Sequence, residues 1–188
     1  VTPDKKVGCL IYKAIDNDIC LYSAHTNYDS AEGGLTDYLC TLLELQKVSI
    51  IKPALLWKES GGLGRIGLLK EELTGSDFIE KVRTRLNLKG FRIVGEAPEK
   101  IEKVAVLNGA YDREMLQSIV ALKVNVLITG DLKYHEAQEL LDFGLFTIDA
   151  GHYSTERVFV DGLSIRLAEK FPHLFIKRYE GEDVFKYY

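Results

Sequence analysis

The chain has 188 residues, of which 46% are hydrophobic and 28% charged, and its formal net charge is −4. These values are typical of a globular domain, and the acidic balance argues against nucleic acid as the main partner. Three widely spaced cysteines exclude a disulfide framework and fit a reducing compartment. Since neither a membrane-spanning apolar run nor a signal peptide is visible, we expect a cytoplasmic protein with no membrane partner.

The first half of the chain mixes helical and extended patterns. Thr2-Pro3-Asp4 is a typical helix start, so the sequence begins where a helix opens, and we expect an upstream segment to be missing. A turn is expected at Gly61–Arg65, where glycines cluster. The apolar spacing predicts helices over 4–16 and 35–45 and strands over 19–24, 48–57 and 66–73.

The second half alternates regularly. Strands are predicted at 91–94, 103–107, 125–129, 145–149 and 173–177, and helices at 76–86, 112–121, 133–143 and 155–170. Alternating strands and helices indicate an α/β fold with layered mixed sheets flanked by helices. Each half also contains an apolar strand that ends in a histidine followed four residues later by an acid. We therefore expect residues 1–188 to form a single domain of two interleaved lobes of similar build.

The sharpest local feature is the segment DAGHYSTE at 149–156. His152 and Glu156 are four residues apart, so a helix that starts here projects both from one face of its first turn. An imidazole and a carboxylate on one face can chelate a divalent ion. The alternative is an exposed His–Glu pair at a helix start.

Two further segments follow predicted strands in the same way. His25 and Asp29 lie beyond the end of the strand at 19–24, where α/β folds place ligands, although a single histidine in such a loop is more often structural. Asp131 and His135 lie at the next strand-to-helix corner, where they either line the cleft or begin the helix. Arg65, in the glycine-rich segment GGLGRIG, is a candidate anion contact.

Together these segments resemble the NGG-interacting-factor-three-like family, whose bacterial members include GTP cyclohydrolase type-two homologs. The resemblance rests on AHTNYD at 24–29, GGLGRIG at 61–67, TGDLKYHEAQELLDFG at 129–144 and DAGHYSTE at 149–156, in this order. It extends from Val1 to near the C-terminus, without the extra middle domain that some members carry.

The resemblance implies a centre of two divalent transition-metal ions, with zinc, iron and manganese all suitable. Asp29 would bind one ion, His152 the other, and Glu156 would bridge them, with His25 in or beside this set. The family also implies a homo-oligomer, a ring-shaped hexamer. The family's paired histidines come from a segment upstream of Val1, so we expect an N-terminally truncated domain with a weaker metal site.

Two functions follow from such a centre. The first is a metal-dependent hydrolase acting on a nucleotide or another small phosphorylated or cyclic substrate, with His25, His135 and Asp131 as candidate proton-transfer groups. The nucleotide rests on the resemblance alone. The second is a non-catalytic metal-binding interaction or regulatory protein. An enzyme needs open metal positions and anion-binding groups such as Arg65 or Lys133, whereas a structural site is closed.

Overall fold

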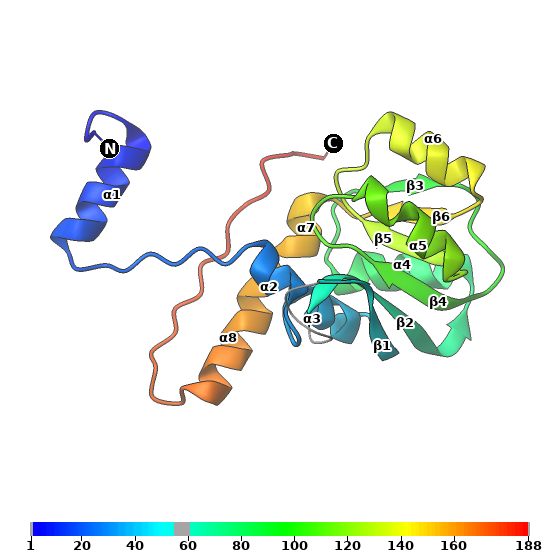
Figure 1. Cartoon of the computed structure of the whole chain (residues 1–188), viewed down its shortest axis with the longest axis horizontal. Coiled ribbons are helices and arrows are strands. Elements are labelled where there is room, and N and C mark those ends of the chain that lie inside the picture. The colour runs from blue at the N-terminus through cyan, green and yellow to red at the C-terminus, as the bar shows by residue number, and fades with distance from the viewer. Residues whose placement is uncertain (1, 55–60, 188) are drawn as a thin grey trace.

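A six-stranded mixed sheet with helices on both faces forms the body of the protein. It is seen in a computed structural model that describes residues 2–54 and 61–187 (Figure 1). The strand order is β1-β2-β4-β5-β6-β3. The strands span Leu45–Pro53 (β1), Gly62–Leu73 (β2), Arg92–Val94 (β3), Ile101–Val106 (β4), Val126–Thr129 (β5) and Phe146–Asp149 (β6). The predicted α/β class with a mixed sheet is confirmed.

Three adjacent strands of this sheet are parallel, and this arrangement creates the edge at which the site lies. In register, Val106 pairs with Ile128, and Ile128 with Ile148, whereas the β1–β2, β2–β4 and β3–β6 pairs are antiparallel. Parallel neighbours need a crossover connection. The connections are a 3-10 turn at Arg113–Met115 with α5 (Leu116–Ala121), and α6 (Tyr134–Asp142).

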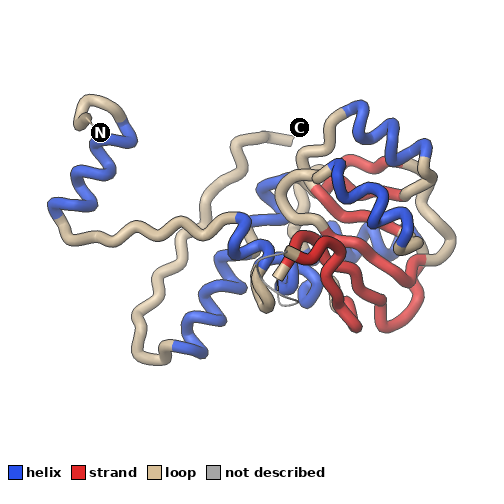
Figure 2. The backbone as a smooth tube through the Cα atoms, viewed as in Figure 1, coloured by secondary structure: helices blue, strands red, loops and turns tan. Residues whose placement is uncertain are grey.

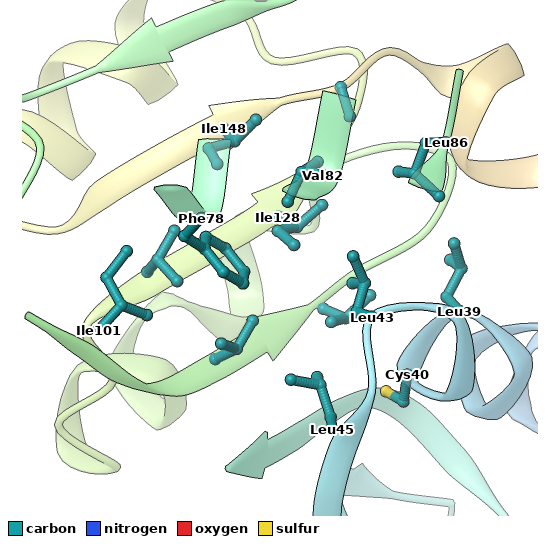
Figure 3. Close-up of a cluster of buried hydrophobic side chains, with 14 of the residues drawn as sticks. Leu39, Cys40, Leu43, Leu45, Phe78, Val82, Leu86, Ile101, Ile128 and Ile148 are labelled. Carbon is teal, nitrogen blue, oxygen red and sulfur yellow. The ribbon is translucent and has the colours of Figure 1, made fainter. Parts of the chain in front are cut away.

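The sheet buries apolar side chains on both faces because successive strand residues point to opposite sides. In β5, Val126 and Ile128 join the cluster under α3 (Leu35–Leu42) and α4 (Gly75–Arg85), and Leu127 joins the cluster under α5 and α6. Figure 3 shows Phe78 and Val82 of α4 beside Ile128. Such continuous apolar runs are typical of strands covered on both faces.

The N-terminal part of the chain lies away from this body. Helix α1 (Lys6–Asp16) forms as predicted, but Val7, Leu10 and Ile15 are all more than half exposed. Figures 1 and 2 show α1 joined to the sheet body by an extended segment. The strand predicted over 19–24 is wrong, because this apolar segment runs extended without a strand partner among the described residues. All strands in the described residues belong to the one six-stranded sheet.

The C-terminal part differs from its prediction in two places. Instead of one helix over 155–170, the chain forms α7 (His152–Glu156) and α8 (Phe159–Lys170). Helix α8 packs on α3, where Gly162 lies against the ring of Tyr38. The strand predicted at 173–177 is extended chain without a strand partner in the described ranges, and this segment returns towards α7 (Figure 1). No helix in residues 2–54 and 61–187 is long and apolar enough to span a bilayer.

Two loop predictions are also corrected. The turn expected at Gly61–Arg65 is largely strand, because β2 begins at Gly62 and Arg65 pairs with Ile50 and Val106. Glycine suits Gly62, where a Cβ would lie 2.4 Å from the Lys52 carbonyl oxygen. The strand predicted over 48–57 is β1, shifted towards the N-terminus, and residues 55–57 lie outside the described residues. The loop at 26–30 is a short helix, α2 (Thr26–Ser30).

Candidate metal centre

The candidate site lies where the carboxyl ends of β4, β5 and β6 meet. Asn108-Gly109 follows β4, Gly130-Asp131 follows β5, and Gly151-His152 follows β6. Because these three strands are parallel neighbours, the three segments emerge at one edge of the sheet. This edge is where open α/β sheets place their ligands.

Two glycines let the three segments approach closely. A Cβ at Gly130 would lie 2.3 Å from the Gly109 carbonyl oxygen and 2.6 Å from the His152 amide nitrogen. Gly109 has a φ of +68°, and a Cβ there would lie 2.5 Å from the Glu156 Oε1 atom. Any side chain at either position would therefore displace backbone or the Glu156 carboxylate.

Helix α7 presents an imidazole and a carboxylate together. His152 is its first residue, and the His152 Nε2 atom lies 3.1 Å from the Glu156 Oε1 atom. The one-face geometry expected from the four-residue spacing is present. Buried Thr155 fixes the helix against the β4 end, because its hydroxyl accepts a hydrogen bond from the Gly109 amide at 2.9 Å.

Asp131 holds the other side of the same imidazole. Its Oδ2 atom lies 2.7 Å from the His152 Nδ1 atom. A carboxylate on Nδ1 fixes the ring and leaves Nε2 for a ligand, an arrangement that metal-binding histidines commonly use. Burial lowers the pKa of His152, but Asp131 and Glu156 outweigh it and raise that pKa above its ordinary value. Asp131 thus contacts the His152 ring, and its role as a proton-transfer group stays a prediction.

Asp29 approaches the site from α2. Partial burial raises the pKa of its carboxyl group, and a hydrogen bond with Asn108 and the charges of His25 and His152 oppose that rise. Asp29 is therefore electrostatically coupled to both histidines. Thr36 supports this side of the site, since its Oγ1 atom lies 2.9 Å from the Asp29 carbonyl oxygen and 2.6 Å from the Asn108 Oδ1 atom.

The two remaining candidate histidines behave differently. His25 directly precedes α2, but its side chain makes no capping hydrogen bond; its Nδ1 atom lies 3.1 Å from the Thr26 hydroxyl, and the residue is exposed. His135 contacts Gln138 one turn along α6, at 2.9 Å, and it does not line the cavity beside His152. Asp131 lines this cavity and His135 does not, so the structure does not bring the two residues together in one cleft. The position of His135 in the first turn of α6 directs its side chain along that helix.

Arg65 is a structural residue, which corrects its prediction as an anion contact. Its side chain is 2% exposed, and its guanidinium donates to Asp37 and to the carbonyl oxygens of Ser30 and Ala31. Further donor contacts reach Gly62 and Gly64. The guanidinium therefore fixes the turn that directly follows Asp29 and has no group left for a ligand.

A cavity of about 880 Å³ adjoins the imidazole. Asp131, His152 and Glu156 line it on one side, and the extended C-terminal residues 183–187 line it on another. Sequence reasoning did not predict this second wall, because the C-terminal segment has no periodic pattern. The closely spaced aromatic residues of the C-terminal segment were the sequence feature that could have indicated this wall.

The donor set remains small in this structure. Within residues 2–54 and 61–187, no three His, Cys, Asp or Glu side chains converge in a metal-binding group. The described chain presents the His152–Glu156 pair, with Asp29 coupled to it electrostatically. An ion here would take further ligands from water.

The comparison with protein families decides the relationship. The family model described as Duf34/NIF3 (NGG1p interacting factor 3) matches residues 1–181. This chain belongs to the Duf34/NIF3 family. The predicted family resemblance is thereby confirmed, and the motifs that carried it include the segments after β5 and β6.

Individual relatives agree with this assignment. A "GTP cyclohydrolase 1 type 2 homolog" of Clostridium perfringens is 33% identical over 100% of this chain and 71% of its own length. The Clostridium acetobutylicum protein of the same name is 32% identical over 83% of this chain and 58% of its own length. A hypothetical protein of Staphylococcus aureus superposes with a TM-score of 0.78 and 27% identity, covering 89% of this chain and 67% of that one. The chain thus spans part of the length of these relatives.

Proposed function

We propose that this Duf34/NIF3 chain carries the metal-binding centre of a metal-dependent hydrolase for a small phosphorylated or cyclic substrate, such as a nucleotide. The proposal rests on one observation. Asp131 holds the Nδ1 atom of His152, which directs the Nε2 atom towards Glu156 beside the cavity. The relatives' names refer to GTP cyclohydrolase, and this favours a nucleotide among the substrates considered.

The donor types of these residues, an imidazole and carboxylates, suit a divalent transition metal. Imidazole nitrogen and carboxylate oxygen suit zinc, iron and manganese alike. His152, Glu156 and Asp29 would hold the metal. Gly109 leaves space that a Cβ would fill directly against the Glu156 and His152 side chains, and Gly130 leaves space against the His152 backbone amide. Bound metal supplies a water of lowered pKa and an electrophilic centre for hydrolysis.

The chain's own residues would prepare the site for that chemistry. Asp131 would keep the imidazole in one orientation and one tautomer by accepting a hydrogen bond from the Nδ1–H group. Thr155 holds the Gly109 backbone amide, and Thr36 contacts both the Asn108 side chain and the Asp29 carbonyl oxygen, so that α7 and α2 stay in register with the β4 end. His25, exposed beside Asp29, would exchange a proton with solvent.

A hydrolysis assay on the metal-loaded protein tests the proposal. Wild type is expected to convert GTP, or to hydrolyse p-nitrophenyl phosphate, and Glu156→Gln is expected to lose this activity. Glu169→Gln is the matched control, because Glu169 is an exposed carboxylate on α8 outside the cavity. Metal-loaded wild type that turns over nucleotides and phosphate esters no faster than Glu156→Gln contradicts the hydrolase proposal.

A non-catalytic interaction role is the second candidate, and the N-terminal region favours it. Leu21 and Tyr22, in the extended segment that joins α1 to the body, are 72% and 85% exposed, and Val7 of α1 is 68% exposed. Apolar surface of this kind is typical of a contact with protein. The expected homo-oligomer stays a proposal, and measuring the mass of the chain in solution checks it.

A further inference from the structure

The C-terminal strap, residues 180–187, contributes part of the wall of the cavity beside His152. Asp183, Phe185 and Tyr187 line this cavity together with residues of α7. The hydroxyl of Tyr153 donates a hydrogen bond to the Gly181 carbonyl oxygen, and this bond ties the strap to α7. The strap therefore forms one wall of the space next to the candidate metal ligands.

Tyr187 is fitted against glycine at two points. A Cβ at Gly90 would lie 2.4 Å from the Tyr187 Cδ1 atom, so the ring packs directly on the glycine backbone. The Tyr187 hydroxyl oxygen lies 3.8 Å from the Cβ position of Gly151, the residue before His152. A side chain at Gly90 would therefore displace the Tyr187 ring from its place beside the candidate metal site.

The cavity combines aromatic rings with cationic groups. Phe91, Tyr153 and Phe159 line it from the body, and Phe185 and Tyr187 line it from the strap. Arg157 also faces the cavity, and its nearest carboxylate, Glu180, is 3.7 Å away, beyond normal hydrogen-bond distance. Aromatic faces stack on planar rings, and guanidinium groups bind phosphate.

We infer that the strap is the ring-binding wall of the substrate pocket, with Tyr187 stacking on a planar heteroaromatic ring whose phosphate reaches Arg157 and the metal site. This inference rests on the proposed function, since it assigns the substrate class of that site. A volume of about 880 Å³ accommodates a ligand of nucleotide size. Phe185 and Tyr187 are 67% and 46% exposed, so their rings are accessible to a ligand.

The test compares two ligands that differ by the ring. Binding of GMP and of ribose 5-phosphate is measured by calorimetry for wild type and strap variants, with metal and after treatment with a chelator. Wild type is expected to bind GMP about tenfold more tightly than ribose 5-phosphate. Tyr187→Leu and Gly90→Ala are expected to lose this preference, the first by removing the ring and the second by displacing it.

Two control variants separate stacking from general damage. Tyr187→Phe keeps the ring and is expected to bind GMP as wild type does. Tyr179→Leu removes an aromatic side chain that is 84% exposed and lies outside this cavity, and it is expected to change nothing. Equal GMP affinity in wild type and Tyr187→Leu overturns the inference, as does a wild type that binds GMP no more tightly than ribose 5-phosphate.

The same samples distinguish failure of this inference from failure of the proposed function. Metal content measured beside each titration reports on His152 and Glu156, which none of these variants alters. Wild type that holds no metal before chelation but still prefers GMP to ribose 5-phosphate supports the ring-binding wall and contradicts the metal centre. Wild type that holds metal but shows no such preference supports the metal centre and contradicts the ring-binding wall.

Discussion

Replacing Arg65 with methionine is expected to lower the free energy of unfolding by about 3 kcal/mol. Breaking a buried ion pair by removing one partner costs about 3–5 kcal/mol. The Arg65 side chain is 2% exposed, but that of Asp37 is 25% exposed, so water can partly solvate the carboxylate that remains. The lower end of the range is therefore expected.

The loss falls on several acceptors at once. Besides Asp37, the guanidinium donates to the carbonyl oxygens of Ala31 and Gly62 at 3.2 and 2.7 Å, and the methionine variant leaves these groups without that donor. Lysine is not expected to restore the stability, because one ammonium group cannot reproduce the planar fork of donors. Arg83→Met is the control, since Arg83 pairs with Glu80 on an exposed helix face.

Thermal and urea unfolding measure the effect. For a chain of this length, a loss of 3 kcal/mol corresponds to a decrease in Tm of about 6–12 °C. Hydrogen exchange is also expected to accelerate at residues 29–31, because Arg65 holds the turn after Asp29. An Arg65→Met variant that unfolds with the wild-type midpoint, or full recovery by Arg65→Lys, would refute this reasoning.

Three further predictions concern buried groups. The Tyr111 hydroxyl is buried without a hydrogen-bond partner in the described structure. The free energy of unfolding of Tyr111→Phe, measured in urea, is therefore expected to equal that of wild type or to exceed it by up to about 1 kcal/mol. Burial raises the pKa of the Cys40 thiol from 9.0 to about 12. The unfolded thiol therefore loses its proton first, stability is expected to fall as pH rises above 9, and Cys40→Ala should flatten that fall in urea titrations at two pH values. Gly130→Ala is expected to reduce metal affinity at least tenfold with the circular dichroism spectrum unchanged, because its Cβ would meet the Gly109 carbonyl and the His152 amide. Gly181→Ala, with no atom within 4 Å of its Cβ position, should bind metal like wild type.

The sequence predicted those parts of the fold that local patterns determine. The strands β4, β5 and β6 were located within two residues, because each contains a short, mainly apolar segment bounded by turn residues. The spacing of His152 and Glu156 likewise placed both on one face of a helix start, and the structure shows them in contact.

Features that depend on distant partners were missed. Arg65 lies in a glycine-rich segment that is typical of a turn, and only the approach of Asp37 and of the turn after Asp29 makes it a buried strand residue. The segment at 19–24 has the composition of a strand, but a strand also requires a paired neighbour, which the described chain does not give it.

The role of Asp131 also depended on long-range geometry. Its position at a strand-to-helix corner indicated a site residue, but only the folded chain brings its carboxylate to 2.7 Å from the His152 Nδ1 atom, 21 residues along the chain. Tyr187 joins the cavity wall because the extended C-terminus returns to Gly90, which no local pattern predicts.

Metal content tests the central claim most directly. Elemental analysis of the purified chain is compared with Glu156→Ala and with Glu169→Ala, a control on the exposed face of α8. The account predicts about two equivalents of a transition metal in wild type and in the control, and loss of most of it in Glu156→Ala. Wild type that holds no metal after incubation with zinc or manganese would contradict the claim that His152, Glu156 and Asp29 form a metal centre in this chain.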